Sequence, residues 1–160
     1  MKAFPIAHAA LLAATTLAIP ALSHARTVTI STTLKHYGGG GAYVAVYLTG
    51  PHGAYDRTLW IAGRRSRYYR HLTEWRRLSE RSTGSLDGVT GASVGEGRTL
   101  KVTADLADAL FDAGYEIHVD AAVEDMHSSP FEIQVPLTRA GSGKPHAGRQ
   151  FVQTFTYQVR

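Results

Sequence analysis

Cysteine and asparagine are both absent from this chain of 160 residues. Without cysteine the protein has no disulfide, no thiol redox chemistry, no thiolate metal site and no lipoprotein anchor. Without asparagine it has no acceptor for N-glycosylation, and its turns must rely on glycine, aspartate and serine. The stability of the fold therefore has to come from packing.

Long apolar runs are also missing, apart from a short one near the amino terminus. The chain opens with Met1-Lys2, continues through an alanine- and leucine-rich run at 9–22, and reaches small residues that end at Ala25. This order is typical of a secretory signal peptide, and the run is too short for a convincing membrane span. We predict a signal peptide at residues 1–25, a single domain at 26–160, and a periplasmic mature protein.

Alternation of apolar and polar residues dominates the remainder of the chain. Such a period of two is typical of half-buried strands, and no alternating βαβ pattern competes with it. We therefore predict an all-β fold, an immunoglobulin-like β-sandwich of about seven strands with one inserted amphipathic helix. The expected strands cover residues 27–34, 42–48, 55–62, 99–104, 115–124, 131–137 and 151–159.

The segment 66–81 changes to the period of a helix. Its apolar residues are spaced by four, three and three positions, which marks one face of a helix. These residues are Tyr68, Leu72, Trp75 and Leu78. The arginines around them are Arg64, Arg65, Arg67, Arg70, Arg76, Arg77 and Arg81. Such a basic surface binds flavin phosphate, an acidic partner or an anionic membrane, or is only a solvated helix face. Export and a net charge of only +4 argue against nucleic acid.

Metal binding and catalysis have weak signals. His118, Asp120 and His127 are weak candidates for a copper or zinc site, because strand alternation puts the first two on one face. Polar residues on the solvated face of a strand give the same pattern. The glycine run at 38–41 lacks the lysine of a phosphate-binding loop and predicts a flexible hairpin connection. No Gly-x-Ser-x-Gly elbow is present, so we expect no catalysis.

The polar turn at residues 87–93 has the sequence Asp-Gly-Val-Thr-Gly-Ala-Ser. Its small residues keep the backbone open, so that a modifying enzyme can draw the loop into an active site. The spacing resembles the acceptor motif of proteins that a periplasmic FMN transferase modifies, joining the flavin phosphate to a hydroxyl through a phosphoester. That resemblance makes Ser93 the acceptor and assigns Asp87, Thr90, Gly91 and Ala92 to the same site. An ordinary structural turn is the alternative.

Side chains near the turn in sequence are the expected neighbours of a flavin. Tyr68, Tyr69, Trp75 and Arg77 would supply stacking and charge beside Ser93. This expectation rests on their closeness in sequence.

Most of the mature chain resembles a family of predicted periplasmic proteins known as domain of unknown function 2271. The segments that carry the resemblance are 42–47, 57–60, 67–69, 72–75, 87–93 and 114–117. Members of that family look to be associated with FMN transferases and with membrane redox proteins bearing PepSY-type domains. The resemblance implies an extracytoplasmic electron carrier with covalent FMN, and not an enzyme. A non-catalytic binding or interaction module, with a structural turn, and a metal-binding protein stay open as alternatives.

Overall fold

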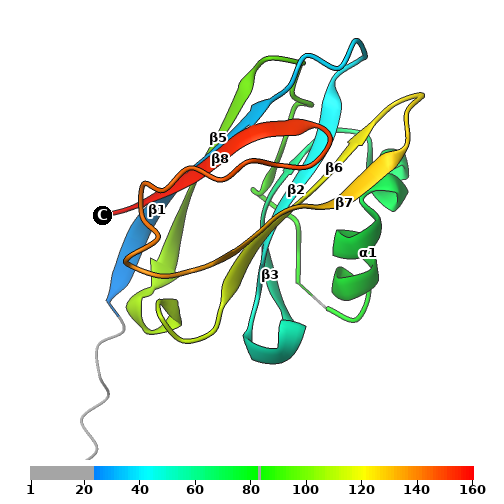
Figure 1. Cartoon of the computed structure of the whole chain (residues 1–160). Helices are drawn as coiled ribbons and strands as arrows, with labels where there is room; N and C mark the ends of the chain where they lie inside the picture. Colours follow the sequence, from blue (N-terminus) through cyan, green and yellow to red (C-terminus); the bar gives the residue numbers. More distant parts are fainter. Residues whose placement is uncertain (1–23, 83) are drawn as a thin grey trace, which may run out of the picture.

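The computed structural model describes residues 24–82 and 84–160 (Figure 1). Most of the predicted signal peptide, residues 1–23, lies outside the described residues. The first strand begins at Ala25, the last residue of the predicted signal peptide, so the predicted cut after Ala25 falls between its first and second residues. Within the described ranges, no helix has both the length and the apolar character needed to cross a membrane.

Three long strands form the smaller of two sheets, in the order β5-β1-β8. β1 is the central strand and is antiparallel to both neighbours. Its residue Ile30 pairs with Val102 on one side and with Tyr157 on the other. The strands are β1 (Ala25–Leu34), β5 (Thr99–Ala107) and β8 (Val152–Val159).

The larger sheet has five strands in the order β4-β3-β2-β6-β7. All neighbours in it are antiparallel except β3 and β4, which are parallel. The strands are β2 (Ala42–Thr49), β3 (Tyr55–Ala62), β4 (Thr90–Gly91), β6 (Glu116–Val123) and β7 (Ser128–Pro136). The two sheets confirm the predicted all-β sandwich, with the two-residue β4 as an addition inside the predicted turn.

The main core lies between the two sheets. The strand alternation predicted from the sequence holds here, because every second residue of a central strand faces inward. Val44 and Val46 of β2 are fully buried and belong to the same apolar cluster as Ile30 of β1 and Phe155 of β8. Burial of such side chains, at about 25 cal/mol per Å² of apolar area, is the main stabilising contribution.

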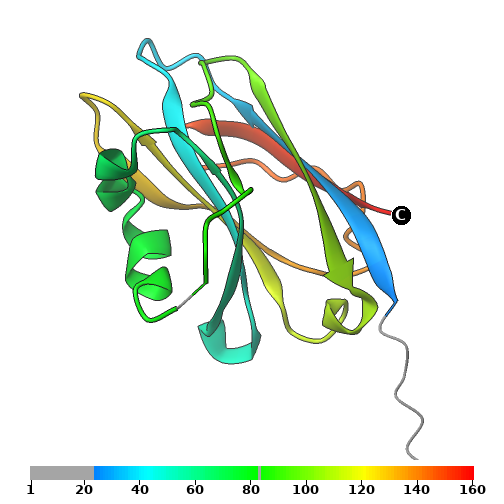
Figure 2. The same cartoon turned by 180° about the vertical axis from the view of Figure 1, so that it is seen from behind.

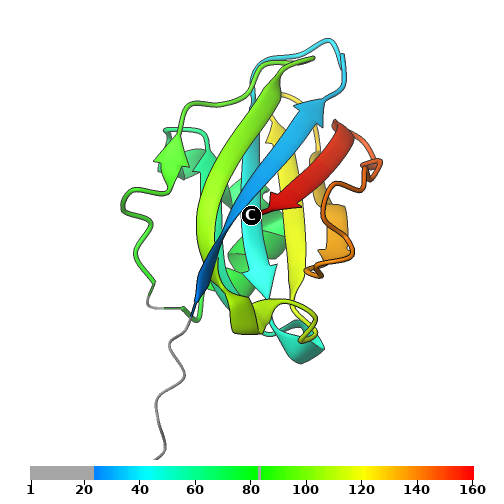
Figure 3. The same cartoon turned by 90° about the vertical axis from the view of Figure 1, so that its left-hand side faces the viewer.

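A short helical layer covers the other face of the five-stranded sheet. Figure 3 shows it behind that sheet when the three-stranded sheet faces the reader. The predicted continuous helix at 66–81 is wrong in detail, because Leu72 has a ψ of 72° and interrupts it. The layer is a 3-10 segment, η2 (Ser66–His71), followed by α1 (Thr73–Ser79). The tighter 3-10 turn buries Tyr69 and leaves Tyr68, which was expected on the buried face, only half-buried.

Two strand boundaries also differ from those expected. β5 continues to Ala107, and β7 already begins at Ser128, where the sequence indicates a loop. Ser128 and Ser129 pair with Ala122 and Ala121 of β6, after a register shift in that ladder. Two further 3-10 turns are η1 (Pro51–Gly53) and η3 (Asp108–Leu110).

Candidate functional site

The polar turn is attached to the sheet at two points, one within the turn and one at the residue that follows it. Thr90 and Gly91 extend the sheet beside β3, and Val94 forms an antiparallel bridge with Ala42 of β2. The Gly63 amide donates to the Gly91 carbonyl at 2.7 Å, and the Ala42 amide donates to the Val94 carbonyl, also at 2.7 Å. Figure 2 shows the green segment running along the sheet towards the loop that precedes β2. The backbone around Ser93 is therefore held in place.

The side chains of the motif point to solvent. Asp87, Thr90, Ala92 and Ser93 are all exposed, whereas the flanking Val94 is buried. A hydroxyl on an exposed segment is open to a modifying enzyme. The structure thus brings the predicted acceptor and its neighbours to the surface on one short segment.

Two glycines allow close packing at this segment. A Cβ on Gly91 would lie 2.6 Å from the Trp60 ring, and a Cβ on Gly41 would lie 2.8 Å from Ser93 Oγ. Side chains at either position would force the backbone or its neighbour to move. Gly91 therefore has a packing reason that does not depend on any transferase, and the glycine loop lies directly beside the Ser93 hydroxyl.

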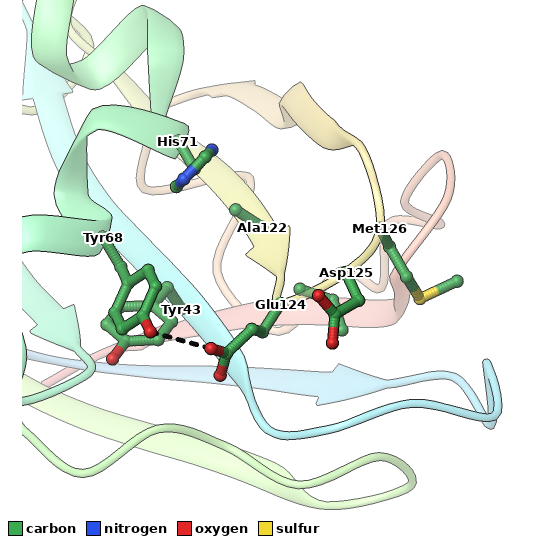
Figure 4. A pocket seen from close by; sticks show the side chains of 8 residues that line it. Tyr43, Tyr68, His71, Ala122, Glu124, Asp125 and Met126 are labelled. Atoms are coloured by element: carbon green, nitrogen blue, oxygen red, sulfur yellow. Dashed lines mark hydrogen bonds between the residues drawn. The ribbon is translucent and has the colours of Figure 1, made fainter.

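Ser93 shares a face of the sheet with Tyr43. Because Ala42 and Val94 form an antiparallel bridge, Ser93 lies opposite Tyr43, and alternation turns both side chains away from the main core. Tyr43 lines a partly open cavity of about 310 Å³, near the lower end of the roughly 300–1,000 Å³ usual for small-molecule sites. The residues lining it are Tyr43, Tyr68, His71, Ala122, Val123, Glu124, Asp125 and Met126 (Figure 4).

Two tyrosines dominate the apolar part of this tyrosine pocket. The ring centres of Tyr43 and Tyr68 are 5.4 Å apart, with their planes at 52°. The Tyr68 hydroxyl donates to Glu124 Oε1 at 2.7 Å, the contact drawn in Figure 4. The Arg67 guanidinium lies 4.8 Å from the centre of the Tyr68 ring. Gly63, with a φ of +127°, leaves room for Tyr43, because a Cβ there would lie 2.0 Å from its ring.

Only one of the four expected flavin neighbours lines the tyrosine pocket. Tyr68 does so. Tyr69 is buried and donates its hydroxyl to the Gly63 carbonyl at 2.8 Å, and Trp75 is only 5% exposed. Arg77 pairs with Glu74 and lines a different groove. Tyr69 and Trp75 therefore belong to the scaffold, and Arg77 is an exposed side chain outside the tyrosine pocket.

Sequence reasoning missed the other residues of the pocket. Tyr43 comes from β2, His71 from the end of η2, and Glu124 and Met126 from the connection between β6 and β7. The one available signal was the position of Tyr43, which follows the glycine loop and alternates with buried Val44.

The weak metal candidates make separate side-chain contacts. His118 Nε2 lies 3.0 Å from Thr49 Oγ1 and 3.2 Å from Glu116 Oε2. His127, by contrast, is exposed and lies 2.7 Å from Gln150 Oε1. In the ranges 24–82 and 84–160, no three histidine, aspartate, glutamate or cysteine side chains are arranged to hold a metal ion.

Asp120 serves the helical layer instead. It is fully buried, because α1 covers a face of β6 that the sequence pattern assigns to solvent. Its carboxylate accepts from the Trp75 amide at 2.7 Å, from the Phe131 amide at 3.1 Å and from the Tyr47 hydroxyl at 3.2 Å. Burial raises the pKa of Asp120 above its usual value, and burial followed by the nearby Asp120 charge also raises the pKa of Tyr47. Asp120 thus caps the first turn of α1 from a distant strand.

The arginines of the helical layer fall into two groups. Arg76 pairs with Glu80 at 3.0 Å, and Arg77 pairs with Glu74. The four arginines that precede α1 are exposed and, like Arg81 after it, have no ion pair with a carboxylate in the part of the chain that the structure describes. They are Arg64, Arg65, Arg67 and Arg70, which we call the arginine surface.

A search of the curated proteins and of the solved structures gives no significant match to this chain. The scan against protein families, in contrast, matches residues 25–154 to the family described as "Predicted periplasmic protein (DUF2271)". The match begins at the first residue of β1 and ends within β8, so it spans both sheets, the polar turn and the tyrosine pocket. The chain therefore belongs to this family of predicted periplasmic proteins.

Proposed function

We propose that this protein is a periplasmic electron carrier that holds FMN by a phosphoester on Ser93. The observation that carries the proposal is the position of the Ser93 hydroxyl. It is exposed, stands on a hydrogen-bonded backbone, and shares a sheet face with the tyrosine pocket. A surface hydroxyl on the same sheet face as an aromatic cavity is what a tethered aromatic cofactor needs.

The attachment forms one bond and breaks another. Ser93 Oγ bonds to the FMN phosphorus of a flavin dinucleotide, the pyrophosphate bond to AMP breaks, and AMP leaves. The hydroxyl proton passes to a base of the FMN transferase, which is the partner that the motif implies. The chain itself contributes the hydroxyl and an open approach, since Ala92 next to it and Gly88 earlier in the turn carry no bulky side chain.

The residues of the tyrosine pocket fit such a group. Tyr43 and Tyr68 offer aromatic faces, and Glu124 and Arg67 hold the Tyr68 side chain in position. When bound, FMN supplies one- and two-electron redox chemistry that the side chains of this chain do not. The protein needs only to hold, tune and expose it, so no catalytic residue is required. A membrane redox protein with a PepSY-type domain is the proposed electron partner, by the family resemblance.

The rival function is a binding module in which residues 87–93 are a structural turn. The close packing of Gly91 on Trp60 favours it, because that packing explains one motif position without any modification. The two functions predict different masses for the exported protein, because only the electron carrier has an added FMN.

The test is to co-produce the exported protein with an FMN transferase and to measure intact mass and in-gel flavin fluorescence after denaturation. We expect one added FMN, lost in Ser93→Ala and kept in Ser66→Ala, a matched exposed serine outside the motif. An unmodified wild-type mass, with the transferase active on a control substrate, would overturn the proposal. Flavin retained by denatured Ser93→Ala would overturn the site.

A further inference from the structure

The arginine surface is a concentration of charge that no carboxylate of the described residues neutralises, although Arg67 donates to the Tyr68 hydroxyl at 3.0 Å and Arg70 donates to His71 Nε2 at 3.3 Å. Arg64, Arg65, Arg67 and Arg70 fall within seven consecutive residues, and all four are exposed. Elsewhere in the layer, Arg77 pairs with Glu74 of α1, and Arg76 pairs with Glu80, the residue directly after α1. Like charges held this close repel one another, and an external anion would relieve that repulsion.

The chemistry of the surface favours carboxylates of a protein over a lipid bilayer. Interfacial segments place apolar side chains beside their basic ones, so that they can insert among the acyl chains. Here Tyr69 and Leu72 are 9% and 0% exposed, because they pack on the sheet, and the half-buried Tyr68 packs on Tyr43 and donates to Glu124. All four cations are arginine, whose planar guanidinium binds a carboxylate through two parallel hydrogen bonds, as it also binds a phosphate, so it is the burial of the apolar side chains that favours a protein partner.

The surface also has a defined place relative to the candidate site. The Arg67 guanidinium lies against the ring of Tyr68, which lines the tyrosine pocket, and Gly63, directly before Arg64, donates to the Gly91 carbonyl of the polar turn. A protein seated on the arginines would therefore lie at the rim of the pocket, close to Ser93.

We infer that Arg64, Arg65, Arg67 and Arg70 form a docking surface for an acidic face of a partner protein. The inference goes beyond the proposed function, because charge pairing at this surface needs no flavin on Ser93. Docking of this kind is electrostatic, so the association weakens as salt is added.

The experiment uses a fluorescently labelled poly-glutamate peptide as the probe and the exported chain as the binder, followed by fluorescence anisotropy at low and physiological ionic strength. Arg65→Gln/Arg70→Gln removes two charges from the arginine surface, and Arg76→Gln/Arg77→Gln removes two from the same layer. We expect binding about fivefold weaker for the first variant, from two pairs of about 0.2–1 kcal/mol each, and little change for the second. Thermal unfolding checks that both variants fold.

Three results would overturn the inference. Equal weakening in the two double variants would mean that only net charge matters. Binding to phosphatidylglycerol vesicles without binding to the peptide would assign the arginines to a membrane. No salt-dependent peptide binding by the wild type would leave the surface without an acidic partner. Ser93→Ala should bind the peptide like the wild type, so a failure of the FMN proposal and a failure of this one give different results.

Discussion

The two faces of β6 are both buried, but by different neighbours. On the inner face, Ile117 and Val119 are fully buried in the apolar cluster between the sheets, whereas on the outer face His118 and Asp120 are buried under the helical layer. Apolar burial is strong and non-directional, so it holds the sheets together in many arrangements. Hydrogen bonds to a buried carboxylate have fixed geometry, so Asp120 sets where the helical layer lies, and that layer carries Tyr68 to the pocket.

Truncation of the inner face should have the largest effect on stability. Ile117→Ala removes a fully buried side chain and leaves a cavity, which costs about 2–5 kcal/mol of unfolding free energy. Chemical denaturation should show a lower midpoint with an unchanged slope. Thr103→Ala, at an exposed position of β5, is the control. A loss for Ile117→Ala no larger than that of the control would contradict the division of roles.

A change on the outer face should have an intermediate effect. Asp120→Asn keeps the size of the side chain but replaces one acceptor oxygen by a donor, which leaves a buried amide without its partner. We expect a loss of about 1–3 kcal/mol. Asp87→Asn, on an exposed aspartate, should change stability by less than about 0.5 kcal/mol. Equal effects of the two substitutions would show that Asp120 does not anchor α1.

The pH dependence of Asp120 has a definite sign. Its pKa is raised in the folded state, so the folded protein binds this proton more readily than the unfolded chain does. Protonation of Asp120 therefore adds stability as the pH falls through the raised pKa towards the ordinary value of 3.8, and that contribution is lost as the pH rises again. The stability advantage of wild type over Asp120→Asn should grow on acidification, and an advantage that shrinks would mean a lowered pKa.

A change in the pocket should have the smallest effect on stability and a visible effect on function. Tyr68 is half-buried, so Tyr68→Leu should change the unfolding free energy by about 1 kcal/mol or less. In flavin-loaded protein it removes a ring that quenches flavin emission, so native fluorescence should rise towards that of denatured protein. Arg70→Leu, at an exposed position outside the pocket lining, is the control. An unchanged emission would remove Tyr68 from the flavin site.

The sandwich could be predicted because period-two patterns survive wherever a strand has an apolar inner face. The burial of the outer face of β6 could not be predicted, because His118 and Asp120 under a helix show the same sequence alternation as polar residues exposed to water. The break in the helical segment was equally hidden. Its cap comes from Asp120, far along the chain, and no residue near Leu72 signals it.

One part of the candidate site could be predicted from the sequence and the other part could not. The polar turn was visible, since its seven residues are contiguous and their spacing is itself the signal. The tyrosine pocket was not, because Tyr43, Tyr68 and Glu124 come from three separate segments that meet only through the pairing of β2 with β6 and the packing of η2. Closeness in sequence chose Trp75 and Arg77 instead, which point elsewhere.

The central place of β1 has a consequence for the order of folding. The strand at the start of the domain pairs with β5, from the second half of the chain, and with β8, its last strand. Contacts so distant along the chain close large loops and form slowly. The three-stranded sheet cannot be completed until the last strand is available, so an emerging chain cannot close the sandwich before its end is made. That delay suits a protein of a periplasmic family, because a chain that has not yet closed its sandwich can still be threaded across a membrane.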